Sequence, residues 1–163
     1  MSTTFQAPSC ETKVAVAERV RGLRSVRDDA DREILFQATV WADMHPPEDG
    51  SINYADATLA PGERISRPEI DYDAGAGLAA ALGMRSESGE DLIAEALEVR
   101  HRLPRVWARV LAGEIEAWRA RRIAQQTLHY PDDVVTEIDE KVADIAHRVG
   151  VITLDRLIDA AMM

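Results

Sequence analysis

Apolar residues recur every three or four positions along most of this chain, and this spacing is the strongest constraint on its fold. Between about residues 11 and 44 the repeat includes Val16, Val20, Ile34 and Trp41. Such spacing places side chains on one face of an α-helix, whereas a strand needs alternating apolar and polar residues. No alternating runs of that kind interrupt the pattern. The sequence therefore predicts an all-α fold of about six to eight irregularly packed helices.

The first helical unit, residues 11–45, is predicted to form a helical hairpin, although one bent helix fits the same residues. Gly22 weakens a helix interior, and Ser25 followed by Asp28 has the spacing of a capping box. His45-Pro46-Pro47 then ends the unit, because a residue that precedes proline avoids the helical conformation. Residues 1–10 are expected to form a flexible tail.

Residues 46–73 form a long polar loop, rich in Pro, Gly, Asp and Glu, without a sustained period. A loop of this length is uncommon in a compact domain, so it is either a partly ordered wrap around the helices or a mobile linker. Residues 74–163 are predicted to form a helical bundle, so that 11–163 is a single helical domain. The last helix has no stop signal, and the chain reads as the N-terminal part of a larger protein.

Proline, glycine and capping residues predict the element boundaries in the bundle. The expected elements are a short helix over 75–82, a helix capped by Ser88 that runs to about Leu103, a helix from Pro104 to Gly113, a helix that starts near Glu114–Glu116, a helix from Pro131 to near Gly150, and a last helix capped by Thr153. The last helix carries an apolar stripe that we expect to be incompletely buried and to drive self-association. The stripe comprises Val151, Ile152, Leu154, Leu157 and Ile158.

Charge is unevenly distributed along a chain whose formal net charge is −10. Residues 28–98 sum to −13, whereas residues 99–128 sum to +5. The overall negative charge argues against a nucleic-acid-binding surface that covers the whole molecule. The basic stretch, about residues 100–122, is therefore the candidate electrostatic site.

The arginines of this stretch are the candidate DNA-binding residues. They are Arg102, Arg105, Arg109, Arg119, Arg121 and Arg122. One interpretation is that they contact DNA phosphates. The other is internal pairing, because Glu98 lies four residues before Arg102, and Glu114 and Glu116 lie between the arginine pairs.

Catalytic and metal-binding patterns are not evident. Cys10 is the only cysteine, which excludes a Cys-x-x-Cys zinc site, and Asp43 with His45 or Asp71 with Asp73 gives too few ligands for a metal. We therefore predict neither a metal nor a cofactor, and no catalytic residue. No apolar run is long enough to cross a bilayer, and the N-terminus has no secretory pattern, so we expect a cytoplasmic protein without a membrane partner.

Three phrases resemble an actinobacterial family, the domain-of-unknown-function-222 proteins. They are Val-Trp-Ala-Asp-Met-His-Pro-Pro at 40–47, Leu-Ala-Ala-Ala-Leu-Gly-Met at 78–84, and the stretch 103–124 that begins Leu-Pro-Arg-Val-Trp. The resemblance implies a helical domain that precedes an HNH endonuclease module. None of the four histidines of this chain lies in an HNH arrangement. The resemblance therefore implies a chain truncated before the nuclease module and without nuclease activity of its own.

Residues 85–124 are also similar to the helix-turn-helix region of chromosome-partition proteins. The helix from Ser88 would then enter the major groove, but the side chains around its start are acidic. They are Glu87, Glu90, Asp91 and Glu95. Because carboxylates repel phosphates, we do not expect this helix to read bases.

Two functions follow from these observations. The first is a non-catalytic helical domain that positions DNA, or a partner protein, for a nuclease module. The second is a protein-interaction or oligomerisation module without DNA binding, in which the arginines meet carboxylates. The partners in these hypotheses are DNA through the basic stretch, a second copy, or the nuclease module.

Overall fold

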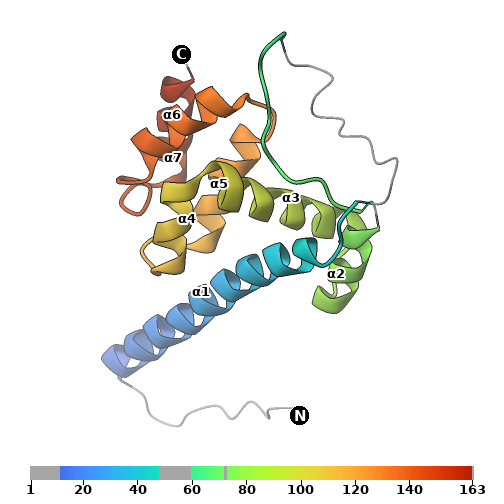
Figure 1. The fold of residues 1–163 in the computed structure, drawn as a ribbon. Coiled ribbons are helices and arrows are strands. Elements are labelled where there is room, and N and C mark those ends of the chain that lie inside the picture. Colours follow the sequence, from blue (N-terminus) through green and yellow to red (C-terminus); the bar gives the residue numbers. More distant parts are fainter. Residues whose placement is uncertain (1–11, 48–59, 72, 163) are drawn as a thin grey trace.

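The computed structural model describes residues 12–47, 60–71 and 73–162, and within these segments it contains seven helices and no strand (Figure 1). The all-α prediction is confirmed. The helices are α1 (Lys13–Asp43), α2 (Ala74–Leu82), α3 (Ser86–Arg102), α4 (Pro104–Leu111), α5 (Ala117–Thr127), α6 (Asp132–Val142) and α7 (Val151–Ala161). No helix of the described segments has the length and apolar character that a membrane crossing requires. The flexible tail predicted over residues 1–10 lies outside the described residues.

Residues 11–45 do not form the predicted hairpin, because α1 is one continuous helix of 31 residues. The Thr12 hydroxyl caps its start by accepting the Ala15 N–H at 3.2 Å. Gly22 lies inside the helix, where its cost of about 1 kcal/mol is too small to break a long run of good helix formers. Asp28 accepts hydrogen bonds from arginine side chains of α1 rather than serving in a capping box.

The two halves of α1 have different surroundings. Leu35, Ala38, Thr39 and Ala42 are buried against the bundle. The first turns of α1 extend away from the other helices (Figure 1). The helix ends at Asp43, two residues before the predicted stop at His45-Pro46-Pro47.

Helices α2 and α3 cross closely because two glycines meet at their contact. A Cβ added to Gly89 would lie 2.3 Å from the Gly75 carbonyl oxygen, so only glycine allows this approach. Helix α2 ends, as predicted, at Gly83, whose φ of 66° is the left-handed conformation. Helix α3 begins at Ser86, two residues before the predicted cap at Ser88, and no side chain caps it.

Helix α3 lies at the centre of the bundle and packs against α1, α2, α4, α5 and α6. Ile93, Ala96 and Val99 are completely buried on it. Leu103 separates α3 from α4, and Pro104 opens α4 as predicted. Gly113, with φ of 74°, follows the end of α4. The predicted helix–glycine–helix arrangement is confirmed.

The last two helices differ from the predicted boundaries. Helix α6 ends at Val142 rather than near Gly150, and turns occupy the chain up to residue 149. Helix α7 follows Gly150, so Thr153 lies inside it and does not cap it. We expected the apolar stripe of this helix to be incompletely buried. Val151 and Ile152 are exposed, but Leu154 and Ile158 are completely buried. Leu154 and Ile158 belong to the core of the bundle and are not available to a partner.

Residues 60–71, the described part of the long polar loop, pack along the bundle as an ordered wrap (Figure 1). Ile65 is 7% exposed, and the Asp132 N–H donates to the Arg64 carbonyl oxygen at 2.9 Å. The Asp71 N–H donates to the His45 carbonyl oxygen at 3.0 Å. The wrap therefore joins the end of α1 to the start of α6.

Candidate functional site

Arg102 of α3 is the most buried arginine of the basic stretch, with 2% of its side chain exposed. Its Nη1 lies 2.8 Å from Oε1 of Glu98, one helical turn earlier, and Glu98 is itself completely buried. Its Nε lies 2.9 Å from Oδ1 of Asp132, and its Nη2 donates to the Tyr130 carbonyl oxygen. All these acceptors belong to this chain, so Arg102 joins α3 to the start of α6.

The wrap contributes to the same cluster. Nη1 of Arg67 lies 3.1 Å from Oε2 of Glu98, so this buried carboxylate binds two arginines. The backbone N–H and the hydroxyl of Ser66 donate to Asp132 at 2.9 and 2.5 Å. Burial alone would raise the pKa of Asp132, but hydrogen bonds from Ser66 and Arg102 outweigh it and lower the pKa below the usual 3.8.

The two candidate arginines of α4 form ion pairs beyond their own helix. Nη2 of Arg105 lies 3.0 Å from Oε1 of Glu140 on α6, with both side chains more than half exposed. Nη1 of Arg109 lies 2.9 Å from Oε2 of Glu114, and its Nη2 donates to Asp144. These pairs fix α4 against the end of α6.

Asp139 of α6 caps the start of α4 from outside the helix. Its Oδ2 accepts the Arg105 N–H at 2.9 Å, and its Oδ1 accepts the Val106 N–H at 3.0 Å. Burial raises the pKa of Asp139 despite these hydrogen bonds. Because Asp139 lies more than 30 residues away in sequence, local capping patterns could not predict this contact.

Arg119 of α5 is directed at the turn between α6 and α7. Its Nη1 donates to the Ala146 carbonyl oxygen at 2.9 Å and to the Val149 carbonyl oxygen. Its Nε lies 2.6 Å from Oε2 of Glu116. Arg119 therefore joins α5 to the turns between α6 and α7.

The remaining candidate arginines of α5 point to different neighbours. Arg121 donates to Glu95 of α3, whose other carboxylate oxygen accepts a 2.8 Å hydrogen bond from Gln125. Arg122 forms a two-point ion pair with Asp155 of α7, at 3.0 and 2.9 Å. The hydrogen bond from Arg122 lowers the pKa of Asp155. Glu95, one of the acidic residues near the start of α3, is thus buried and faces α5, not an open groove.

The six arginines are therefore joined to oxygen atoms of this chain, as the internal-pairing interpretation anticipated. Arg105 and Arg122 are the more exposed of them, with 58% and 43% of their side chains exposed. A phosphate that approached these two would compete with a carboxylate already in place. DNA binding through this stretch stays a prediction.

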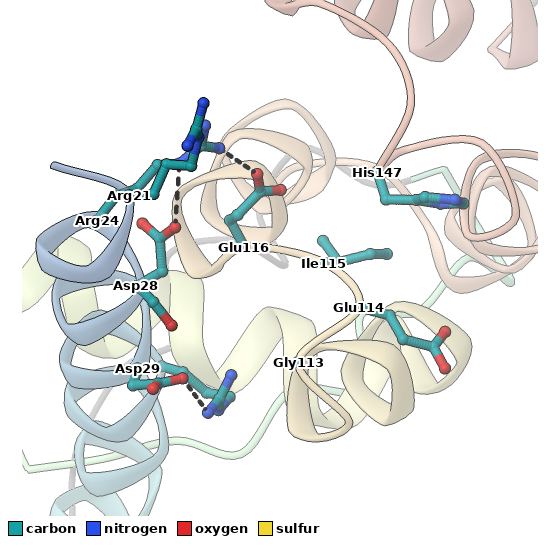
Figure 2. Close-up of a pocket in the computed structure, with 11 residues that line it drawn as sticks. Arg21, Arg24, Asp28, Asp29, Gly113, Glu114, Ile115, Glu116 and His147 are labelled. Atoms are coloured by element: carbon teal, nitrogen blue, oxygen red, sulfur yellow. Dashed lines mark hydrogen bonds and ion pairs between the residues drawn. The ribbon is translucent and has the colours of Figure 1, made fainter. Parts of the chain in front are cut away.

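A cleft of about 360 Å³ lies between α1 and the α4–α5 connection, residues 113–116 (Figure 2). Nη2 of Arg24 lies 3.2 Å from Oε1 of Glu116 and its Nε lies 3.4 Å from Oδ2 of Asp28. Figure 2 shows Asp28 and Asp29 pointing from α1 toward this connection. Three arginines and four carboxylates line the cleft, so its net charge is close to zero and gives little selection for an ionic ligand.

His147 is the histidine that lines the cleft. Across the described segments, no three His, Cys, Asp or Glu side chains lie close enough to hold a metal ion. Nε2 of His147 lies 2.8 Å from Nε of Arg148, and His147 has no carboxylate neighbour among its described contacts.

The Asp43 side chain pairs with Arg100 at 2.6 Å, and His45 Nδ1 lies 2.7 Å from the Trp41 carbonyl oxygen. These contacts give Asp43 and His45 structural roles.

The exposed arm, residues 13–30 of α1, leaves several large apolar side chains uncovered. Val16, Val20, Leu23 and Val26 are 45%, 58%, 62% and 66% exposed. The sequence period correctly indicated a helix here, but it did not reveal whether the apolar face meets a core or water. The charge pattern of α1, basic and then acidic, was the one signal that could have distinguished this half from the buried half.

Comparisons of this chain with protein-family models, with curated proteins and with solved structures found no match. The functional argument therefore rests on the geometry of this molecule.

Proposed function

We propose that this chain is a non-catalytic protein-interaction module and that the exposed arm is its docking element. The arm has the features expected of such an element: a regular helix, apolar side chains in contact with water, and few contacts with the bundle. A helix that lays its apolar face on a partner is a recurrent mode of recognition.

The observation that carries this proposal is the exposure of the arm's large apolar side chains. Val14 is 67% exposed and Leu23 is 62% exposed, although fully burying an aliphatic side chain of this size contributes roughly 1.5–3 kcal/mol. Contiguous apolar surface on a folded domain commonly marks an interaction site. A partner that covered the arm would recover this free energy.

The arginine pairs support a protein partner over DNA. The candidate arginines already bind carboxylates or backbone carbonyls, and the chain carries a net charge of −10. In the context that the family resemblance implies, the module would position a partner protein for a nuclease. That context stays a prediction.

Photo-crosslinking of the full chain in cells tests the proposal. A benzophenone amino acid replaces Leu23 on the arm, and a matched chain carries it at Ile152, an apolar residue of α7 that is 70% exposed. We expect a discrete crosslinked protein product from position 23 and none from position 152.

The absence of a protein product from position 23, or a product that contains only nucleic acid, would contradict the proposal. Identical products from both positions would also contradict it, because they would show contact by collision rather than by docking at the arm.

A further inference from the structure

We infer that the partner of the exposed arm is a second copy of this chain, with the two α1 helices packed antiparallel. This inference rests on the proposed function and names the partner for it. Two independent features of α1 carry it: the spacing of the apolar side chains, and the separation of opposite charges along the helix.

The apolar side chains of the arm form a stripe suited to helix pairing. Val16, Val20, Leu23, Val26 and Ala30 follow one another at spacings of three and four residues. Such spacing keeps side chains on one face, where those of a second helix can interlock with them. The stripe continues into Ile34, which packs against the core, so a partner on the arm would extend the apolar interior of the bundle.

The charges of α1 are divided between its two halves. Residues 13–27 contain five basic residues and one acidic residue, whereas residues 28–43 contain five acidic residues and one basic residue. In an antiparallel pair, the basic half of each copy lies beside the acidic half of the other. A parallel pair would place like charges together, which is destabilising.

The acidic half remains available to a second copy although it packs against its own bundle. Asp31 and Glu33 are exposed, and the Asp29 side chain is 60% exposed. The basic half is exposed along its length, and its first turns extend away from the bundle (Figure 1), although Arg24 pairs with Glu116. A two-fold axis across α1 would therefore form both sets of contacts at once, as a symmetric dimer requires.

A second copy matches the arm better than a nucleic acid does. Phosphates would satisfy the basic residues but would leave the apolar stripe and the acidic half without partners. A second copy supplies all three, because the excess of basic residues in one half equals the excess of acidic residues in the other. Charge and apolar surface thus indicate the same occupant.

Sedimentation of the full chain over a range of concentrations provides the first test. We expect wild-type protein with twice the mass of a single chain, and loss of the dimer in the variant Val20→Glu/Leu23→Glu. The matched control is Val151→Glu/Ile152→Glu on α7, where the replaced residues are 44% and 70% exposed. We expect the control to remain dimeric. Circular dichroism verifies that both variants are helical.

Charge reversal tests the antiparallel order. The variant Arg19→Glu/Arg27→Glu should weaken the dimer by at least about tenfold, because these exposed positions flank the apolar stripe and would place carboxylates against the partner's acidic half. Adding Asp31→Arg/Glu33→Arg to the same chain should recover part of the lost affinity, because the new arginines then face the new carboxylates across the interface. A parallel dimer would respond to the double variant in the opposite way: the two changes lower the net charge of the basic half from +4 to zero, which removes repulsion between like halves and strengthens the dimer.

A wild-type chain that is monomeric at every concentration overturns the inference, as does a dimer lost only in the α7 control. If Leu23 then crosslinks to a different protein, the interaction function stands and only the identity of the partner is wrong. If Leu23 crosslinks to nothing, both proposals fail. A dimer that the double variant strengthens, or that the fourfold variant does not partly restore, overturns the antiparallel order.

Discussion

Glu98 connects three segments that are distant in the sequence. Its carboxylate is completely buried and binds Arg102 within α3 and Arg67 of the wrap. Arg102 in turn binds Asp132 at the start of α6. A buried carboxylate is tolerated only when its partners compensate for the water that it has lost.

Replacing Glu98 by Ala should therefore lower the free energy of unfolding by about 3–5 kcal/mol, because two arginines would lose their buried partner. The matched control is Glu137→Ala, which removes the exposed pair of Glu137 with Lys141. We expect the control to change the free energy of unfolding by less than about 1 kcal/mol. Urea unfolding measures the free energy of unfolding of both variants. Equal losses would show that the buried Glu98 cluster contributes no more to stability than an exposed ion pair.

Spacing in the sequence predicted only the ion pairs between residues that lie close together in the chain. Glu98 lies four residues before Arg102, and Glu114 and Glu116 lie close to Arg109 and Arg119, so these pairs could be anticipated and are observed. The partners of the other arginines lie on helices that are distant in the chain. Their identity depends on how α4, α5, α6 and α7 pack, which a period of 3.6 residues does not specify.

Helices α2 and α3 illustrate how one atom can set the distance between two elements. A Cβ on Gly89 would lie 2.3 Å from the Gly75 carbonyl oxygen and 2.8 Å from the Ala79 Cβ. Neither a backbone oxygen nor a buried methyl group can move away easily in a closely packed contact.

We expect Gly89→Ala to lower the free energy of unfolding by about 1–3 kcal/mol through this steric conflict. Gly22→Ala is the matched control, because a Cβ at Gly22 would meet nothing within 4 Å. Alanine favours a helix over glycine by up to about 1 kcal/mol, so the control should leave stability unchanged or raise it. Thermal unfolding of the two variants provides the comparison, and a neutral Gly89→Ala would contradict the packing argument.

At the scale of elements, the sequence was informative wherever a boundary depends on a local signal. Pro104 and Gly113 act through their own backbone preferences, and the helix between them was predicted correctly. The hairpin over residues 11–45 was wrong because Gly22 weakens a helix without ending it. Apolar period alone does not reveal whether a helix face meets a core or water, so the exposed arm was missed.

At the scale of the whole molecule, negative charge surrounds a set of arginines that are already paired. We expect no measurable binding of a labelled DNA duplex at about 0.15 M salt, where the Debye length is about 8 Å. The contrary result would be weak binding with a steep salt dependence. Four phosphate contacts would give a slope of log affinity against log salt near roughly −3.6, from about 0.9 per contact.

The variant Arg105→Ala/Arg109→Ala serves as the control in that titration. The three ion pairs of these residues are at least partly exposed, so their loss should change stability by no more than about 1 kcal/mol per pair. If wild-type protein binds and the variant flattens the slope by about two units, the arginines contact phosphate. The interaction module would then be a DNA-binding domain.

The continuity of α1 across Gly22 also makes the helix a spacer of defined length. Residues 13–30 span about 27 Å at 1.5 Å per residue, without a joint at which they could bend. A molecule held near Lys13 would therefore sit at a fixed separation from the bundle and in a fixed direction. Inserting one residue into this stretch would displace its tip by about 1.5 Å and rotate it by about 100°. The number of residues in the arm therefore determines both the distance and the orientation of a molecule bound at its tip.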